Sequence, residues 1–198
     1  MSIKMTQDIK PYKQGIDNLC GVYASINSTL LSANGLAKFS KKQVKGWFQE
    51  IIADLYKHRK LLLVHKEGSE VELVEGYLGI IQSHIANDIK LSYYKPFNDK
   101  TRTTAAIKKI LTISKQSNTA VIIGIQGLHD HWSVIERITA DRIYLNDSNG
   151  LKFLRLSNMP RIYDLTVEDT IVVKAESACN LTIPRMHSRK SVKSKSNP

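Results

Sequence analysis

Apolar residues recur at helical spacing as far as residue 114 and at alternating positions after residue 118. The first pattern predicts four helices, at about 19–31, 40–56, 69–85 and 104–114. The second pattern, rich in β-branched residues, predicts short strands at 120–126, 132–138, 142–146, 152–156 and 170–175. Helices followed by consecutive hairpins indicate an α+β fold with a largely antiparallel sheet.

Capping signals mark where three of these helices begin. Ser40 and Gln43 form the pattern of a capping box for the second helix, and Ser69 with Glu72 is expected to form another for the third. The polar pair at 17–18 can cap the free N–H groups of the first helix through its Asp or its Asn side chain.

Cys20 lies at the opening turn of the first predicted helix, where unpaired amides and the helix dipole favour a thiolate over a thiol. Gly21 leaves the approach to the sulfur open. Gln14 is a candidate side-chain donor to the oxyanion that forms when a carbonyl is attacked, with the Cys20 amide as the second donor. These neighbours make Cys20 a candidate nucleophile, whereas an isolated cysteine such as Cys179 is expected to be a core residue.

His131 opens a predicted strand and is the candidate general base, because a histidine there can lean over a helix end that packs on the sheet. His129 is the alternative base. Asp147 directly follows the next predicted strand, at 142–146. It is the candidate carboxylate that orients the imidazole, with Asn146 or Asn149 as alternatives.

The turn between these two strands decides whether the base and the carboxylate can meet. A turn over 139–141 pairs residue 138 with residue 142, and His131 and Asp147 then project from the same face of neighbouring strands. A two-residue turn would place them on opposite faces. We expect the longer turn.

These residues resemble, in order and approximate spacing, the motifs of the papain-like cysteine peptidases. The likeness is greatest to the bacteriocin-leader (double-glycine) peptidases and their stand-alone relatives. The matching positions are Gln14, Cys20-Gly21 with Ala24 in the same helix, His131-Trp132 and Asp147-Ser148.

The resemblance implies an N-terminal helical part carrying the nucleophile, packed on a C-terminal antiparallel sheet. It implies that Cys20 is the nucleophile, His131 the general base and acid, Asp147 the orienting residue and Gln14 the oxyanion donor. The expected activity is hydrolysis of an amide or peptide bond in a protein or peptide substrate, with no metal or organic cofactor. Leu19 departs from the pattern, since leader peptidases usually have a polar residue there. The clan also includes glutamine deamidases and acyltransferases, several of them bacterial effectors, so these two activities stay open.

The composition suits one domain, and we expect a single papain-like domain over 1–184 followed by a disordered basic tail over 185–198. The tail carries five Lys and Arg and no acidic residue, so it holds five of the eleven net positive charges and leaves +6 on the rest. No nucleic-acid-binding motif accompanies this charge, and we expect no specific nucleic-acid partner. The oligomeric state is not indicated.

Two cysteines are too few for a disulfide framework, and neither a membrane-spanning apolar run nor a Sec signal is found. We therefore expect a cytoplasmic protein, with export as an effector by another route still open.

A zinc site is a competing interpretation, because His129 and His131 share a strand face and Asp130, Asp147 or Cys20 could complete it.

No recognised zinc spacing supports that site, so we expect no metal. Three further interpretations remain: a catalytically silent binding module of the same fold, a basic nucleic-acid-binding protein, and an ordinary turn at 147–150, whose composition is common in turns.

Overall fold

The computed structural model describes residues 9–14, 17–98, 100–127, 130–159 and 163–178. Cys179, His129 and the basic tail at 185–198 lie outside these residues. The helices are α1 (Cys20–Ser32), α2 (Lys41–Lys57), α3 (Leu61–Glu67), α4 (Val71–Ile85) and α5 (Thr103–Ile113). The strands are β1 (Ile89–Tyr94), β2 (Thr119–Gly127), β3 (His131–Ile138), β4 (Arg142–Asn146), β5 (Phe153–Arg155) and β6 (Tyr163–Ser177), with a single 3-10 turn, η1 (Leu156–Asn158), after β5.

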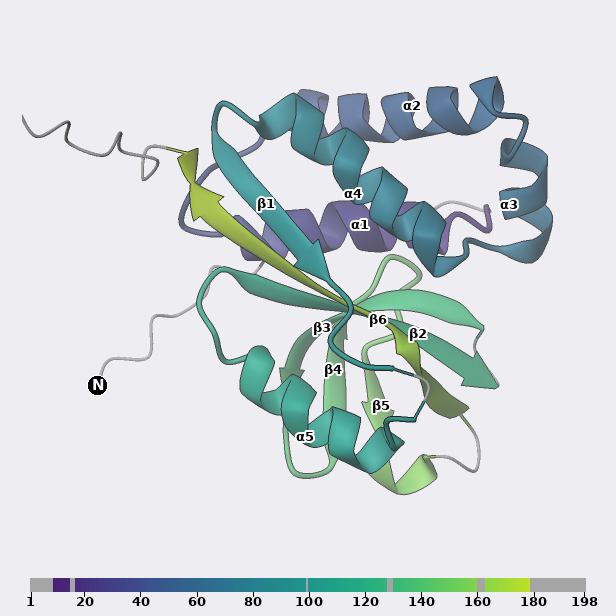
Figure 1. Ribbon diagram of the computed structural model, residues 1–198, viewed down its shortest axis with the longest axis vertical. Helices are drawn as coiled ribbons and strands as arrows, with labels where there is room; N and C mark the ends of the chain where they lie inside the picture. Colours follow the sequence, from purple (N-terminus) through teal and green to yellow (C-terminus); the bar gives the residue numbers. More distant parts are fainter. Residues whose placement is uncertain (1–8, 15–16, 99, 128–129, 160–162, 179–198) are drawn as a thin grey trace, which may run out of the picture.

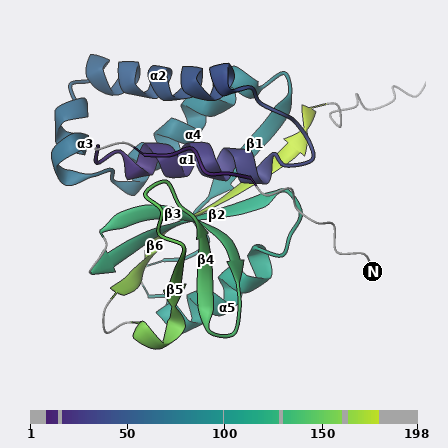
Figure 2. The ribbon, with the colours of Figure 1, turned by 180° about the vertical axis from the view of Figure 1, so that it is seen from behind.

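The strands form one antiparallel sheet in the order β1-β6-β2-β3-β4-β5. Side chains alternate between its two faces along β2. Ala120 and Ile122 belong to the core that includes α1, α2 and α4, whereas Val121 and Ile123 pack with α5. Figures 1 and 2 show α1 to α4 together at one end of the molecule and α5 apart from them beside the sheet. The expected α+β class, with an N-terminal helical part on a C-terminal antiparallel sheet, is confirmed.

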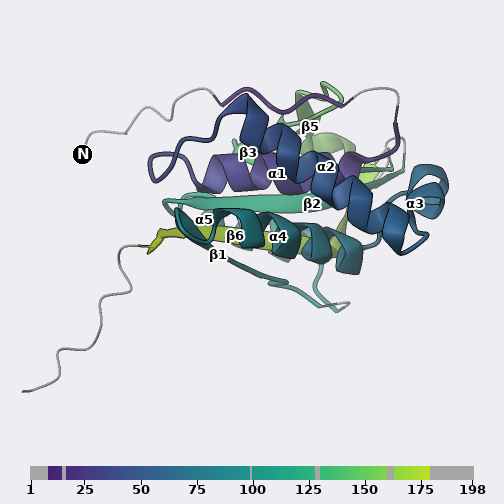
Figure 3. The same cartoon turned by 90° about the horizontal axis from the view of Figure 1, so that it is seen from above.

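Helix α1 is the central helix of the helical part. It contacts α2 and α4 as well as strands β2, β3 and β6, and Figure 3 shows it running beside β2 with α2 crossing in front of it. Ser25, Ser28 and Thr29 are buried in it, and each hydroxyl donates to a backbone carbonyl within the helix at 2.9 Å. These internal hydrogen bonds satisfy the buried hydroxyl groups, so α1 can be enclosed by its neighbours.

Of the two predicted capping boxes, the one at Ser40 is present and the one at Ser69 is not. Ser40 and Gln43 bond to one another's backbone N–H groups as expected. The box at Ser69 and Glu72 is wrong, because α4 begins at Val71 and has no side-chain cap. The Ser69 hydroxyl instead pairs with the Tyr77 hydroxyl at 3.2 Å.

The sequence pattern does not predict α3 or β1. Helix α3 has seven residues and exposes Leu62 and Leu63, so it carries no helical apolar stripe. Strand β1 lies at the edge of the sheet and pairs only with β6. Strand β6 is also longer than the predicted 170–175, because its first half pairs with β2 beyond a bulge. Among the described helices, none is long and apolar enough to cross a membrane.

Candidate active site

Cys20 is the first residue of α1 and is 8% exposed. No side chain caps this helix, so the prediction of a cap at 17–18 is wrong. Asp17 instead holds the turn before the helix, accepting from the Leu19 N–H at 3.2 Å and from the Tyr23 hydroxyl at 3.1 Å. Asn18 donates to the His65 carbonyl of α3. The helix start next to Cys20 therefore keeps its dipole without a competing side-chain oxygen on its first amides.

Gly21 lets α1 approach the segment before α4. A Cβ at this position would lie 2.7 Å from the Ser69 Cβ and 3.1 Å from Val74 Cγ2. The Ser69 carbonyl also accepts the indole N–H of Trp132 in β3 at 2.7 Å. Ser69 thus lies between the helix that carries Cys20 and the strand that carries His131. This close packing, in addition to the open access expected from the sequence, is what requires glycine here.

A Gly21→Ala substitution is expected to destabilise the fold by about 1–3 kcal/mol, because the added methyl group overpacks a buried contact with Ser69. Gly46→Ala in α2 is the matched control, since nothing lies within 4 Å of its Cβ. Replacing that helical glycine is expected to stabilise by about 0.5–1 kcal/mol. Urea unfolding of both variants measures the two signs. Equal stabilisation by both would show that the Ser69 contact is not tight.

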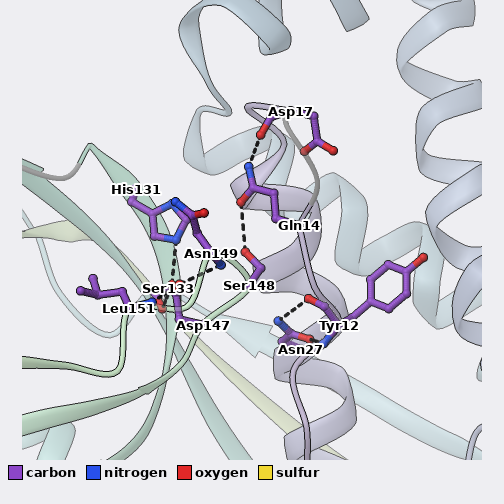
Figure 4. Close-up of polar contacts among 10 residues, drawn as sticks. All are labelled: Tyr12, Gln14, Asp17, Asn27, His131, Ser133, Asp147, Ser148, Asn149 and Leu151. Carbon is purple, nitrogen blue, oxygen red and sulfur yellow. Dashed lines mark hydrogen bonds and ion pairs between the residues drawn. The ribbon is translucent and has the colours of Figure 1, made fainter.

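His131 and Asp147 meet, as Figure 4 shows: Nε2 of His131 lies 2.7 Å from Oδ2 of Asp147. The register that brings them together differs from the expected one at the turn, because Ile138 pairs with Ile143 and not with Arg142. A bulge after Ile135 then shifts the pairing by one residue. The turn prediction is wrong, and the bulge restores the expected side-chain facing near the site.

Four donors surround the buried carboxylate of Asp147. Its Oδ1 accepts the backbone N–H groups of Asn149 and Leu151, each at 2.9 Å. Its Oδ2 accepts the Ser133 hydroxyl at 2.7 Å besides contacting His131. Burial raises the pKa of Asp147, but the hydrogen bond and charge of His131, with the other donors, hold it below its ordinary value. Asp147 is therefore ionised at neutral pH.

His131 is charged in this setting. Burial lowers its pKa, but the hydrogen bond and charge of Asp147, together with the nearby Cys20, raise it to about 9. Nε2 faces Asp147, which leaves Nδ1 as the ring nitrogen that can exchange a proton with Cys20. An imidazole that is bonded to a carboxylate and lies close to a thiol is the arrangement that can stabilise a thiolate.

Gln14 lies beside the loop that follows β4. Its backbone N–H donates to the Ser148 carbonyl at 3.1 Å, and its Oε1 accepts the Ser148 hydroxyl at 3.1 Å (Figure 4). Its Nε2 donates to the Asp17 carbonyl. A carbonyl can only accept, so the NH₂ end of the carboxamide faces Asp17 at the start of α1. Its second N–H has no hydrogen-bond acceptor among the described residues.

The other sequence candidates have different places. Asn146 donates from Nδ2 to the Ile9 carbonyl, and its buried Oδ1 has no hydrogen-bond partner among the described residues. Asn149 contributes a backbone N–H to Asp147, so it is the carboxylate and neither amide side chain that contacts the imidazole. Within the described ranges, no three His, Cys, Asp or Glu side chains gather as a metal site.

Two residues near the site had no role predicted from the sequence. Ser133 is a polar residue inside an otherwise apolar stretch of β3, and that interruption is a signal in the sequence. Tyr77 lies on α4, and burial together with the charge of Cys20 raises its pKa against the hydrogen bond from Ser69. Tyr77 is therefore near enough to Cys20 for the Cys20 charge to affect its pKa. No local pattern in the sequence indicates that these two residues are neighbours.

No protein-family model matches the chain, and no curated protein matches it in sequence. Among solved structures, the chain is similar to a double-glycine-motif protease from an AMS/PCAT transporter, determined in complex with the leader peptide. The two share 15% identity over 88% of this chain and 96% of that one, with a TM-score of 0.46.

Proposed function

We propose that this protein is a papain-like thiol hydrolase that cleaves an amide or peptide bond through Cys20, His131 and Asp147. One observation carries the proposal: Nε2 of the largely buried His131 lies 2.7 Å from Oδ2 of Asp147, and Cys20 is near enough to help raise the pKa of His131. A thiol placed next to an imidazolium at a helix start is activated as a nucleophile. The packing of α1 on β3 keeps this pair together.

In the proposed reaction, the Cys20 thiolate forms an S–C bond with the substrate carbonyl carbon, and the carbonyl π electrons move to oxygen. The remaining N–H of Gln14 and the Cys20 backbone N–H stabilise this oxyanion. The intermediate collapses, the C–N bond breaks, and His131 protonates the leaving amine. His131, now neutral, takes a proton from water as its oxygen attacks the thioester, and the thiolate leaves beside a recharged His131.

The same steps would release ammonia from a glutamine side chain, or pass the acyl group to an amine in place of water. Substrate shape and the acceptor decide among these reactions. The centre itself is common to all of them, and the substrate we propose is a protein or peptide. No metal or organic cofactor takes part in the proposed steps.

Alkylation of Cys20 across pH tests the proposal without a known substrate. The wild-type protein is treated with iodoacetamide or a peptidyl chloromethyl ketone, and adducts on Cys20 and Cys179 are mapped by mass spectrometry. Cys20 is expected to react well below about pH 8.5, where ordinary thiols ionise, and Cys179 is expected not to. In His131→Ala the Cys20 reaction should move to higher pH.

Cys20→Ala is the blank for this experiment. A Cys20 that reacts no faster than an ordinary thiol, with no dependence on His131, would contradict the hydrolase and favour the silent binding module. Incubation of the active protein with a mixed peptide library then separates the reactions: shortened peptides indicate hydrolysis, glutamate in place of glutamine indicates deamidation, and joined peptides indicate acyl transfer.

A further inference from the structure

Ser133 makes a second side-chain contact with the oxygen that orients His131. Its hydroxyl donates to Oδ2 of Asp147 at 2.7 Å, and the same Oδ2 lies 2.7 Å from His131 Nε2. Ser133 is 1% exposed, two residues after His131 on β3, and faces Asp147 across the neighbouring strand end (Figure 4). It cannot touch a substrate, because it is enclosed.

The two oxygens of Asp147 are held from different parts of the fold. Oδ1 is bonded by the N–H groups of Asn149 and Leu151, which belong to the same loop as Asp147 itself. These bonds shape the loop but do not tie it to β3. The Ser133 hydroxyl does, because it comes from the strand that carries His131. Rotation of the carboxylate away from the imidazole would break this buried hydrogen bond.

We infer that Ser133 is a positioning residue of the proposed centre, holding Oδ2 of Asp147 at the ring of His131. The inference rests on the proposed role of Asp147 in the thiol hydrolase. A hydroxyl that donates to a carboxylate also stabilises its charged form, and the Ser133 hydrogen bond contributes to the lowered pKa of Asp147. Ser133 therefore acts on both the direction and the charge of the carboxylate.

Removing the hydroxyl has a distinct expected signature. A hydrogen bond to a charged, buried group is stronger than one between neutral groups, so Ser133→Ala is expected to lower kcat about tenfold or more. KM should be unchanged, because Ser133 does not reach the substrate. The pKa of Asp147 should rise toward its ordinary value, so the acid midpoint of Cys20 alkylation should move to higher pH.

Three variants test the inference. Ser133→Ala removes the hydroxyl, and Ser133→Thr keeps it and should restore most of kcat and the acid midpoint. Ser28→Ala is the matched control: Ser28 is equally buried, but its hydroxyl donates to the Ser25 carbonyl within α1. It should leave kcat and the midpoint unchanged even where it lowers the melting temperature.

Acid unfolding gives a readout that needs no substrate. The folded-state pKa of Asp147 lies below its unfolded value, so the ionised carboxylate stabilises the fold above that unfolded value, and this contribution is lost as pH falls through the folded-state pKa. In Ser133→Ala the loss should begin at higher pH, whereas in Ser28→Ala the melting temperature should shift equally at every pH.

The outcomes separate the two proposals. If wild-type Cys20 is activated and Ser133→Ala changes neither kcat nor the acid midpoint, the inference is overturned and the hydrolase stands. If wild-type Cys20 is inert and no peptide is altered, the hydrolase is overturned and the inference with it. A kcat loss that Ser133→Thr reverses, accompanied by the shifted midpoint, supports both.

Discussion

Replacing His131 by alanine is expected to lower kcat/KM about 10²- to 10⁴-fold, on whichever peptide the wild-type protein cleaves fastest in a mixed library. The variant loses the group that we propose protonates the leaving amine and activates the Cys20 thiol. Steady-state kinetics near neutral pH measure the effect. His84→Ala is the control, because His84 is an exposed histidine in the last turn of α4.

The stability of the same variant should depend on pH in a defined direction. The pKa of His131 in the folded protein is raised to about 9 from an ordinary 6.5. The stabilisation of the folded state by the protonated imidazole is therefore fully present below about pH 6.5 and is lost as pH rises through about 9. The difference in melting temperature between wild type and His131→Ala should shrink over that interval. A constant difference, or full activity of His131→Ala, would rule out the charged pair.

Trp47→Ala is expected to lower the free energy of unfolding by about 3–5 kcal/mol without entering the chemistry. Trp47 lies on α2, is 3% exposed, and packs edge-on against Phe39 with ring centroids 4.8 Å apart. The substitution leaves a cavity in the core that surrounds α1. Urea unfolding measures the loss, and the fraction of protein that stays folded should still alkylate at Cys20.

Tyr56→Ala supplies the contrast on the same helix. The apolar spacing of the sequence groups Tyr56 with the buried face of α2, but Tyr56 is 76% exposed near the end of the helix. Its replacement should change stability by no more than about 0.5 kcal/mol. Similar losses in both variants would mean that the core around Trp47 is loosely packed.

The positions of the site residues follow from local patterns. Cys20 is at a helix start and His131 at a strand start, because helical spacing of apolar residues begins near residue 19 and an alternating segment begins near residue 132; both starts agree with the prediction to within a residue. The register between β3 and β4 does not follow from local patterns. It depends on a turn that is one residue longer than the expected 139–141 and on a compensating bulge after Ile135. Either change alone would place His131 and Asp147 on opposite faces of the sheet.

The roles of Ser69 and Gly21 are likewise beyond local reasoning. Ser69 has the sequence context of a helix cap, yet its hydroxyl bonds to Tyr77 and its carbonyl to Trp132. Gly21 is adjacent to the nucleophile, and its need for close approach becomes visible only once Ser69 is packed on it. The contacts of Ser69 with Gly21 and with Trp132 join segments about 50 residues or more apart, so no capping or spacing rule contains them.

The sequence alone determined the α+β class, the order of helices and strands, and the residue types available for thiol chemistry. These depend on periodicity and on neighbours within a few residues, which a chain carries with it before folding. Tertiary structure decided which faces meet, how Ser133 and Asp147 share a hydrogen bond, and why the pKa of His131 is raised. Those properties arise from burial and from contacts between distant segments, and they exist only after the sheet and α1 have packed together.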